Sequence, residues 1–155
     1  MNPGASGGMR LLSAVTVGEL TRRAHVRVTA DTPLGTVVDE MTAKKRGCVL
    51  VEDGGALVGI FTERDLYSRV DHAGSGWSTQ AVREVMTPRP VVSQPGDSLA
   101  DALRQMIAGR RRHLPVVDDA GRVLGLLSVR DILAFVAQRF PEELMNLPPD
   151  PGHET

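Results

Sequence analysis

Two seven-residue segments contain, at matching positions, residue types that can hold a sugar and a phosphate. Gly59–Asp65 and Gly125–Asp131 each consist of glycine, two apolar residues, a hydroxyl residue, a variable residue, arginine and aspartate. The hydroxyl residue can cap a helix whose free N–H groups favour an anion. The aspartate, three residues later, can accept hydrogen bonds from the two vicinal hydroxyls of a ribose. The candidate residues for ribose and phosphate are therefore Thr62, Asp65, Ser128 and Asp131.

The same residues also fit an explanation that needs no ligand. A hydroxyl residue followed three positions later by an acid resembles a capping box, in which side chains pair with backbone N–H groups at a helix start. Capping would account for a single copy. Because the pattern returns in both halves after a similar hairpin, the sequence favours two equivalent binding corners. The leading glycines, Gly59 and Gly125, admit a close approach by another backbone or by a ligand.

Basic residues gather where the first helix of each half should end, in Lys44–Arg46 and Arg110–Arg112. Cations there complement the negative end of the helix dipole, an effect of about 0.3 to 1 kcal/mol. Alternatively, some of them reach ligand phosphates, for which arginine offers bidentate geometry. The candidates for phosphate binding are Arg46, Arg64, Arg111, Arg112 and Arg130, of which Arg64 and Arg130 lie in the first turn of the motif helices.

Metal binding and catalysis find little support in the sequence. Cys48 and His113 occupy corresponding positions, but zinc requires three or four ligands. The other histidines, His25, His72 and His153, are expected in a strand, a linker and a tail. A serine at a helix cap without a positioned histidine is not a catalytic nucleophile. We therefore expect no metal site and no enzymatic activity.

The two seven-residue segments belong to an internal repeat. When the sequence is aligned with itself at a shift of 65 residues, four pairs match: Val17 with Val82, Leu34 with Leu99, Met41 with Met106 and Arg46 with Arg111. The second copy then has one extra residue in a turn. Beyond it the shift is 66, and Gly59 matches Gly125 and Asp65 matches Asp131. An insertion confined to a loop is typical of two copies of one folded unit. Two such units can bury each other's apolar faces, which predicts a groove between them as a ligand site.

Each copy has the pattern β-α-β-β-α. A short strand should lead to a helix whose apolar residues recur every three or four positions, followed by a hairpin and a second helix starting at the hydroxyl residue. In the first copy the strand is Val26–Val28, the helix runs through Met41, and the hairpin pairs Cys48–Val51 with Leu57–Phe61. In the second copy the strand is Val91–Ser93, the helix runs through Met106, and the hairpin pairs Leu114–Val117 with Val123–Leu127. The predicted fold is α/β (α+β), with pseudo-twofold symmetry and small sheets flanked by helices.

The predicted organisation is a flexible N-terminus at 1–12, repeat one at 13–70, a linker at 71–80, repeat two at 81–139 and a flexible tail at 140–155. A formal net charge of −1 provides no overall field to hold the protein on nucleic acid or a membrane, so any anion site must be local. A single cysteine and no long apolar segment favour a reducing cytoplasm.

The sequence resembles the tandem cystathionine-β-synthase (CBS) domain pair, or Bateman module, over Val17–Ala137. The resemblance includes Val85–Pro88, His113–Asp118 and both seven-residue motifs. It implies that the motif hydroxyl and aspartate hold the ribose and phosphate of an adenosine ligand. It also implies that adenine lies among aliphatic side chains, for which Val51, Pro115 and Val116 are the candidates.

Copy one departs from the family pattern at two places. It has Val49–Val51 where copy two has Leu114–Val116 with its proline, and Thr21–Arg23 where the family has Met-Thr-Pro. We therefore expect the two clefts to differ in affinity.

The resemblance further implies a regulatory module that binds AMP, ADP or ATP, forms a homodimer through its helices, and signals to an unidentified effector protein. Two alternatives remain open at this point. The ligand can be another adenosyl compound, S-adenosylmethionine or NAD(H), because ribose recognition does not identify the group on the 5′ carbon. The chain can also be a structural dimerisation module with empty clefts.

Overall fold

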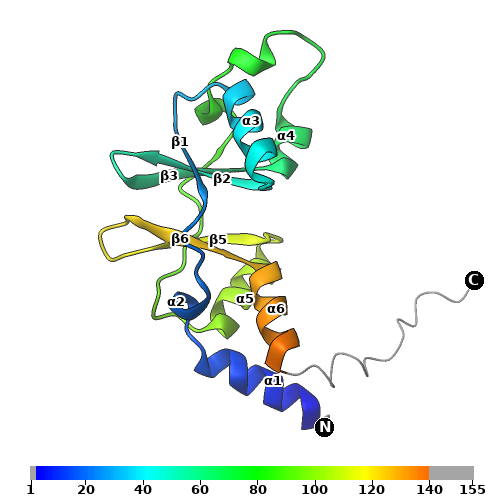
Figure 1. Cartoon of the computed structure of the whole chain (residues 1–155), viewed down its shortest axis with the longest axis vertical. Coiled ribbons are helices and arrows are strands. Elements are labelled where there is room, and N and C mark those ends of the chain that lie inside the picture. The colour runs from blue at the N-terminus through cyan, green and yellow to red at the C-terminus, as the bar shows by residue number, and fades with distance from the viewer. Residues whose placement is uncertain (1–2, 140–155) are drawn as a thin grey trace, which may run out of the picture.

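The computed structural model describes residues 3–139 of the chain as two stacked halves, each with a sheet toward the middle and helices outside (Figure 1). The elements are α1 (Pro3–Ala14), α2 (Val17–Leu20), β1 (Val26–Thr29), α3 (Leu34–Lys44), β2 (Cys48–Asp53), β3 (Ala56–Thr62), α4 (Glu63–Arg69), the 3-10 turns η1 (Trp77–Thr79) and η2 (Val82–Glu84), β4 (Thr87–Pro88), α5 (Leu99–Ala108), β5 (His113–Val117), β6 (Val123–Ser128) and α6 (Val129–Arg139). The predicted mixed α/β fold is confirmed.

The hairpins and helix starts form where the turn and capping residues predict them. The turn of the first hairpin has Gly54 at φ 58° and Gly55 at φ 85°, a left-handed backbone that glycine adopts without strain. The second hairpin turns at Gly121, with φ 79°. Thr62 precedes α4 and Ser128 precedes α6, as expected.

The two halves are joined by an exchange of their lead-in segments, residues 16–25 and 81–90. Strand β4 belongs to the second repeat but completes the four-stranded sheet β1-β2-β3-β4 of the first, with Thr87 opposite Ile60. Reciprocally, Arg22 pairs with Leu126 of the two-stranded sheet β5-β6 through two backbone hydrogen bonds of 2.9 Å. The lead-in segment of each repeat therefore pairs with the edge strand of the other repeat's sheet, as pseudo-twofold symmetry requires.

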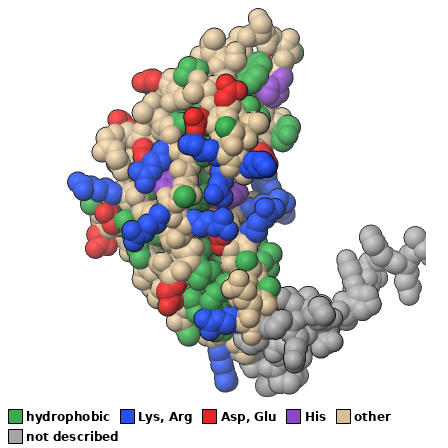
Figure 2. Space-filling view, in the orientation of Figure 1, with side chains coloured by type: hydrophobic (Ala, Val, Ile, Leu, Met, Phe, Trp, Pro, Cys, Tyr) green, Lys and Arg blue, Asp and Glu red, His purple; other side chains and the backbone are tan. Residues whose placement is uncertain are grey.

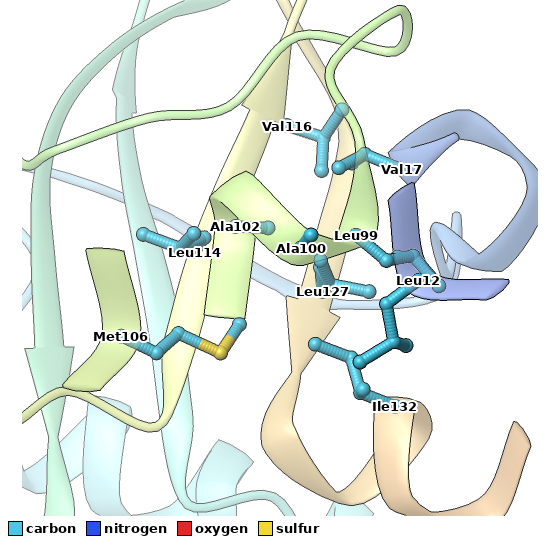
Figure 3. Close-up of a cluster of buried hydrophobic side chains, with 10 residues drawn as sticks. All are labelled: Leu12, Val17, Leu99, Ala100, Ala102, Met106, Leu114, Val116, Leu127 and Ile132. Atoms are coloured by element: carbon cyan, nitrogen blue, oxygen red, sulfur yellow. The ribbon is translucent and has the colours of Figure 1, made fainter. Parts of the chain in front are cut away.

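The hydrophobic cores follow the same exchange. Val17 packs among α5, β5, β6 and α6 of the second repeat (Figure 3). Val82 and Val85 pack reciprocally in the core of the first repeat. A third cluster between the two sheets contains Cys48, Leu50 and Ile60. The repeats thus do not pack as separable units, because each core includes the lead-in segment of the other.

The N-terminal segment differs from the prediction of a flexible region at 1–12. Residues Pro3–Ala14 form helix α1, which packs against α5, and Leu12 is only 8% exposed in the second core. The glycine-rich start obscures this helix in the sequence; Leu12 is its buried side chain, and Val15, just beyond its end, packs against the same core. The predicted tail at 140–155 lies outside the described residues.

Two further segments differ from the sequence prediction. The expected strand Val91–Ser93 is reduced to a single bridge between Ser93 and Val116. The chain just before it contains Arg89, with φ 45°, and Pro90, which has no N–H donor for a sheet. The linker at 71–80 is partly packed, with Trp77 against the first core. Within residues 3–139, no helix is long and apolar enough to cross a membrane.

Replacing Gly125 by alanine tests the exchanged packing. A Cβ atom at this position would overlap the carbonyl oxygen of Arg22, so we expect Gly125→Ala to lower the free energy of unfolding by about 1 to 3 kcal/mol. Gly96→Ala is the matched control, since a Cβ there meets nothing within 4 Å. Urea unfolding measures both variants. Equal stability of the two would contradict the close crossing.

Candidate ligand clefts

Two clefts lie between the repeats, with volumes of about 530 Å³ and 590 Å³. We call the larger one the Asp65 cleft; its lining includes Ile60, Thr62, Asp65, Thr87 and Pro115. The smaller is the Asp131 cleft; its lining includes Arg22, Val26, Leu126, Ser128 and Asp131. Both volumes fall in the range of small-molecule sites.

The two clefts are related by the repeat. Thr62, Asp65 and Ile60 correspond to Ser128, Asp131 and Leu126 by the shift of 66. Four residues, Gly47, Glu63, Arg112 and His113, line both clefts and so form a common wall. Each cleft is consequently built from both repeats, and its shape depends on how the repeats sit against each other.

Both motif acids are buried and bound to their own helix starts. In the Asp65 cleft, Oδ2 of Asp65 accepts hydrogen bonds from the Thr62 N–H at 2.9 Å and from the Thr62 hydroxyl at 3.2 Å. In the Asp131 cleft, Oδ2 of Asp131 accepts from the Ser128 N–H at 3.1 Å and from the Ser128 hydroxyl at 2.8 Å. The capping interaction is therefore present, but it uses only one oxygen of each carboxylate.

The second oxygen of each carboxylate faces a cation. Oδ1 of Asp131 lies 2.5 Å from Nε of Arg22. Oδ1 of Asp65 lies 3.5 Å from Nε of Arg69, four residues later on the same helix. A buried carboxylate needs such partners because losing water around an unpaired charge is costly. Oδ1 is thus the oxygen that a ligand hydroxyl would approach in each cleft.

All five arginines predicted for phosphate binding line a cleft. Arg46 and Arg130 lie in the Asp131 cleft, Arg64 and Arg111 in the Asp65 cleft, and Arg112 in both. The Nη1 atom of Arg64 donates to the backbone carbonyl of Arg110 at 3.2 Å, so this side chain is partly committed to the protein. Blue side chains of Lys and Arg cross the middle of the molecule in Figure 2, so positive charge is local although the net charge is nearly zero.

Sequence reasoning missed several basic residues of the clefts. They are Arg22 and Lys45 in the Asp131 cleft, and Arg69, Arg89 and Arg110 in the Asp65 cleft. Lys45 and Arg110 are in the basic clusters that end the first helices, which was a usable signal. Arg22 and Arg89 reach a cleft only because the lead-in segments cross between repeats, and no local pattern shows this.

The structure places the three residues predicted for the adenine pocket in different surroundings. Pro115 lines the Asp65 cleft. Val51 and Val116 do not fit the prediction, since both are completely buried in the cores of their own repeats. Side chains alternate across a strand, so Val116 faces its helices when Pro115 faces the other repeat. The same alternation directs Leu50 toward the central cluster and Val51 away from it.

Two titratable side chains of the clefts, His113 in the common wall and Cys48 in the Asp131 cleft, have pKa values shifted by burial. Burial lowers the pKa of the His113 imidazole, and the carboxylate of Asp131 only partly offsets this effect. Burial raises the pKa of the Cys48 thiol to about 12, and the charge of Asp65 adds to the increase. A neutral thiol is a poor nucleophile and a poor metal ligand. Among residues 3–139, no group of three or more His, Cys, Asp or Glu is placed to hold a metal ion.

Comparison with known proteins identifies the family. The CBS domain family model matches residues 17–72 and 82–138. These two matches cover most of the chain and coincide with the two repeats. The chain belongs to the CBS domain family.

The chain is similar to parts of two much longer proteins. It is 32% identical over 138 residues to the meiotically up-regulated gene 70 protein of Schizosaccharomyces pombe, a match that covers 89% of this chain and 18% of that protein. It is 40% identical over 99 residues to inosine-5′-monophosphate dehydrogenase of Mycobacterium tuberculosis, covering 62% of this chain and 18% of the enzyme. The chain thus spans about 18% of the length of these curated relatives.

Two solved structures have the same fold along nearly their entire length. A CBS-domain-containing protein from Agrobacterium tumefaciens is 34% identical with a TM-score of 0.71, covering 78% of this chain and 98% of that one. CBSX2 in complex with AMP is 27% identical with a TM-score of 0.71, covering 80% and 97%. The arrangement of the two repeats is therefore shared with these two structures.

The titration of His113 tests the burial of the common wall. We expect its imidazole to titrate below 6.5, because burial disfavours the charged form. Since the unfolded imidazole then binds a proton more readily than the folded one, the stability contributed by His113 falls as pH drops below 6.5. NMR of the ring protons, assigned by their loss in His113→Gln, measures the midpoint. A midpoint at or above 6.5 would show that the wall is open to water.

Proposed function

We propose that the chain is a regulatory module that binds an adenine nucleotide, AMP, ADP or ATP, in the clefts between its repeats. The observation that carries the proposal is a buried aspartate, Asp65 or Asp131, in a cleft lined by arginines, with one carboxylate oxygen fixed by a helix cap and the other beside an arginine. The similar protein CBSX2, whose structure contains AMP, supports it.

The lining of the Asp65 cleft is suited to each part of a nucleotide. The Asp65 carboxylate can accept hydrogen bonds from the ribose hydroxyls, as acids do in dinucleotide sites. Arg111 and Arg112 can pair with the phosphates by the charge-assisted, bidentate geometry typical of arginine. Ile60 and Pro115 provide apolar surface for the adenine ring. This combination of groups favours a phosphate-bearing adenosine over the sulfonium cation of S-adenosylmethionine.

Binding would act on the relative position of the two repeats. Both contribute to each cleft, so a ligand that fits one arrangement better stabilises that arrangement. An effector protein in a reducing cytoplasm would respond to the difference. The module itself performs no chemical step in this proposal, with the nucleotide as regulatory ligand rather than as cofactor or substrate.

A homodimer is part of the same proposal. Tyr67 on α4 and Leu133 on α6 correspond by the repeat, and they are 81% and 59% exposed. Ile107 on α5 is 70% exposed. Large apolar side chains exposed on successive outer helices favour a protein interface. Tyr67 and Leu133 also border the Asp65 and Asp131 clefts, so the second copy would lie close to the bound ligand.

Ligand-dependent stability tests the nucleotide site. A ligand at 100 times its dissociation constant should stabilise the protein by about 2.7 kcal/mol. We expect thermal shifts with AMP, ADP or ATP, weaker ones with S-adenosylmethionine and NADH, and none in the double variant Asp65→Asn with Asp131→Asn. Asn keeps the size and the capping oxygen of each side chain but removes its charge.

The control is Asp39→Asn, at an exposed position on α3 away from both clefts, which should respond like the wild-type chain. An equal shift in the double variant would show that these acids do not hold the nucleotide. No shift with any of the compounds would favour a ligand-free dimerisation module. Steady turnover of a nucleotide would contradict the assignment of a purely regulatory role.

Replacing Tyr67 by glutamate tests the dimer. A charge in an apolar interface is unfavourable, so Tyr67→Glu should raise the dissociation constant of the dimer at least tenfold. Analytical sedimentation measures this as a shift toward the monomer. Ser68→Glu, on the same helix, is the matched control, since Ser68 is also exposed and polar. A wild-type chain that sediments as a monomer would remove this part of the proposal.

A further inference from the structure

The ion pair between Arg22 and Asp131 makes the two clefts unequal. Oδ2 of Asp131 is already used by the cap of α6, which leaves Oδ1 for a ligand hydroxyl. Nε of Arg22 lies 2.5 Å from this same Oδ1. A ribose that binds Asp131 therefore meets an arginine of the protein itself on the oxygen that it needs.

The backbone of Arg22 holds this side chain in place. Arg22 donates a hydrogen bond to the Leu126 carbonyl and accepts one from the Leu126 N–H, both at 2.9 Å. The crossing is close because Gly125, next to Leu126, has no Cβ to keep the Arg22 carbonyl away. Arg22 is therefore presented to the start of α6 by a fixed strand crossing rather than by a chance surface conformation.

The corresponding position in the other cleft carries no charge. Thr87 is the counterpart of Arg22, and it pairs with Ile60 just as Arg22 pairs with Leu126. The ion pair formed by Asp65 is instead with Arg69 of its own helix, at the longer distance of 3.5 Å. Charge-assisted pairs are strongest near 2.7 to 2.9 Å, so Oδ1 of Asp65 is the less firmly held oxygen.

We propose that Arg22 is an intramolecular competitor for the ribose, which makes the Asp65 cleft the tighter nucleotide site and the Asp131 cleft the weaker one. The inference rests on the proposed nucleotide binding and adds which cleft fills first. Because the Arg22 side chain is 52% exposed, a displaced guanidinium regains water, and the competition is limited to about tenfold in affinity.

Calorimetry with AMP on the full chain can isolate the weaker cleft. In an Asp65→Asn background only the Asp131 cleft keeps its acid. Adding Arg22→Thr, which copies the residue type of the other repeat, should strengthen AMP binding about tenfold. Arg22→Gln, which keeps most of the side-chain length without the charge, should strengthen it in the same direction if the threonine variant is unstable. Arg27→Thr is the control, since Arg27 is similarly exposed but pairs with Glu52 on β2.

The possible outcomes separate this inference from the proposed function. Unchanged or weaker AMP binding after removal of Arg22 would overturn the competition and identify Arg22 as neutral or as a phosphate ligand. If AMP binding instead fails to respond to Asp65→Asn and Asp131→Asn together, the proposed site is wrong and the competition falls with it. In the wild-type chain, Asp65→Asn should remove the tighter of two binding events and Asp131→Asn the weaker. The reverse order would also overturn the inference.

Discussion

The crossing of the lead-in segments is the constraint on which the rest of this structure depends. The backbone of Arg22 lies directly over the motif glycine of the other repeat, Gly125, whereas the space over Gly59 is filled by the side chain of Met86. These crossings place valines of each lead-in segment in the opposite core. They hold the two sheets at a spacing that leaves a cleft on either side. The fold and the candidate site thus have one common cause, the absence of a side chain at two strand positions.

The same crossing makes small sequence differences between the repeats matter to the site. Positions related by the repeat meet the same cleft geometry, so a substitution in one copy changes one cleft selectively. Arg22 against Thr87 changes the charge beside the buried acid. Cys48 and His113 also correspond, but the inert thiol lines only the Asp131 cleft, whereas the imidazole with its lowered pKa lines both clefts. Pseudo-symmetry therefore provides two clefts, and divergence makes them different.

Much of this architecture is predictable from the sequence because it is local. Thr62 and Ser128 mark helix starts by their own capping chemistry, and the hairpin turns need glycine for positive φ. The buried acids follow from the repeat of that motif. The predictions that failed concern contacts between segments that are far apart in the sequence. The choice of Val51 and Val116 required knowing which strand face looks toward the other repeat, and Arg22 becomes a cleft residue only through the crossing. The packing of Leu12 similarly depends on a partner helix about ninety residues away in the sequence.

A crystal structure of the chain grown with AMP is the most direct test of the central claim, that a buried acid in an inter-repeat cleft holds the sugar of a nucleotide. We expect AMP in the Asp65 cleft, with its ribose hydroxyls on Oδ1 of Asp65 and its phosphate toward Arg111 and Arg112. AMP bound away from both acids, or bound in a cleft with its ribose turned to solvent, would contradict it.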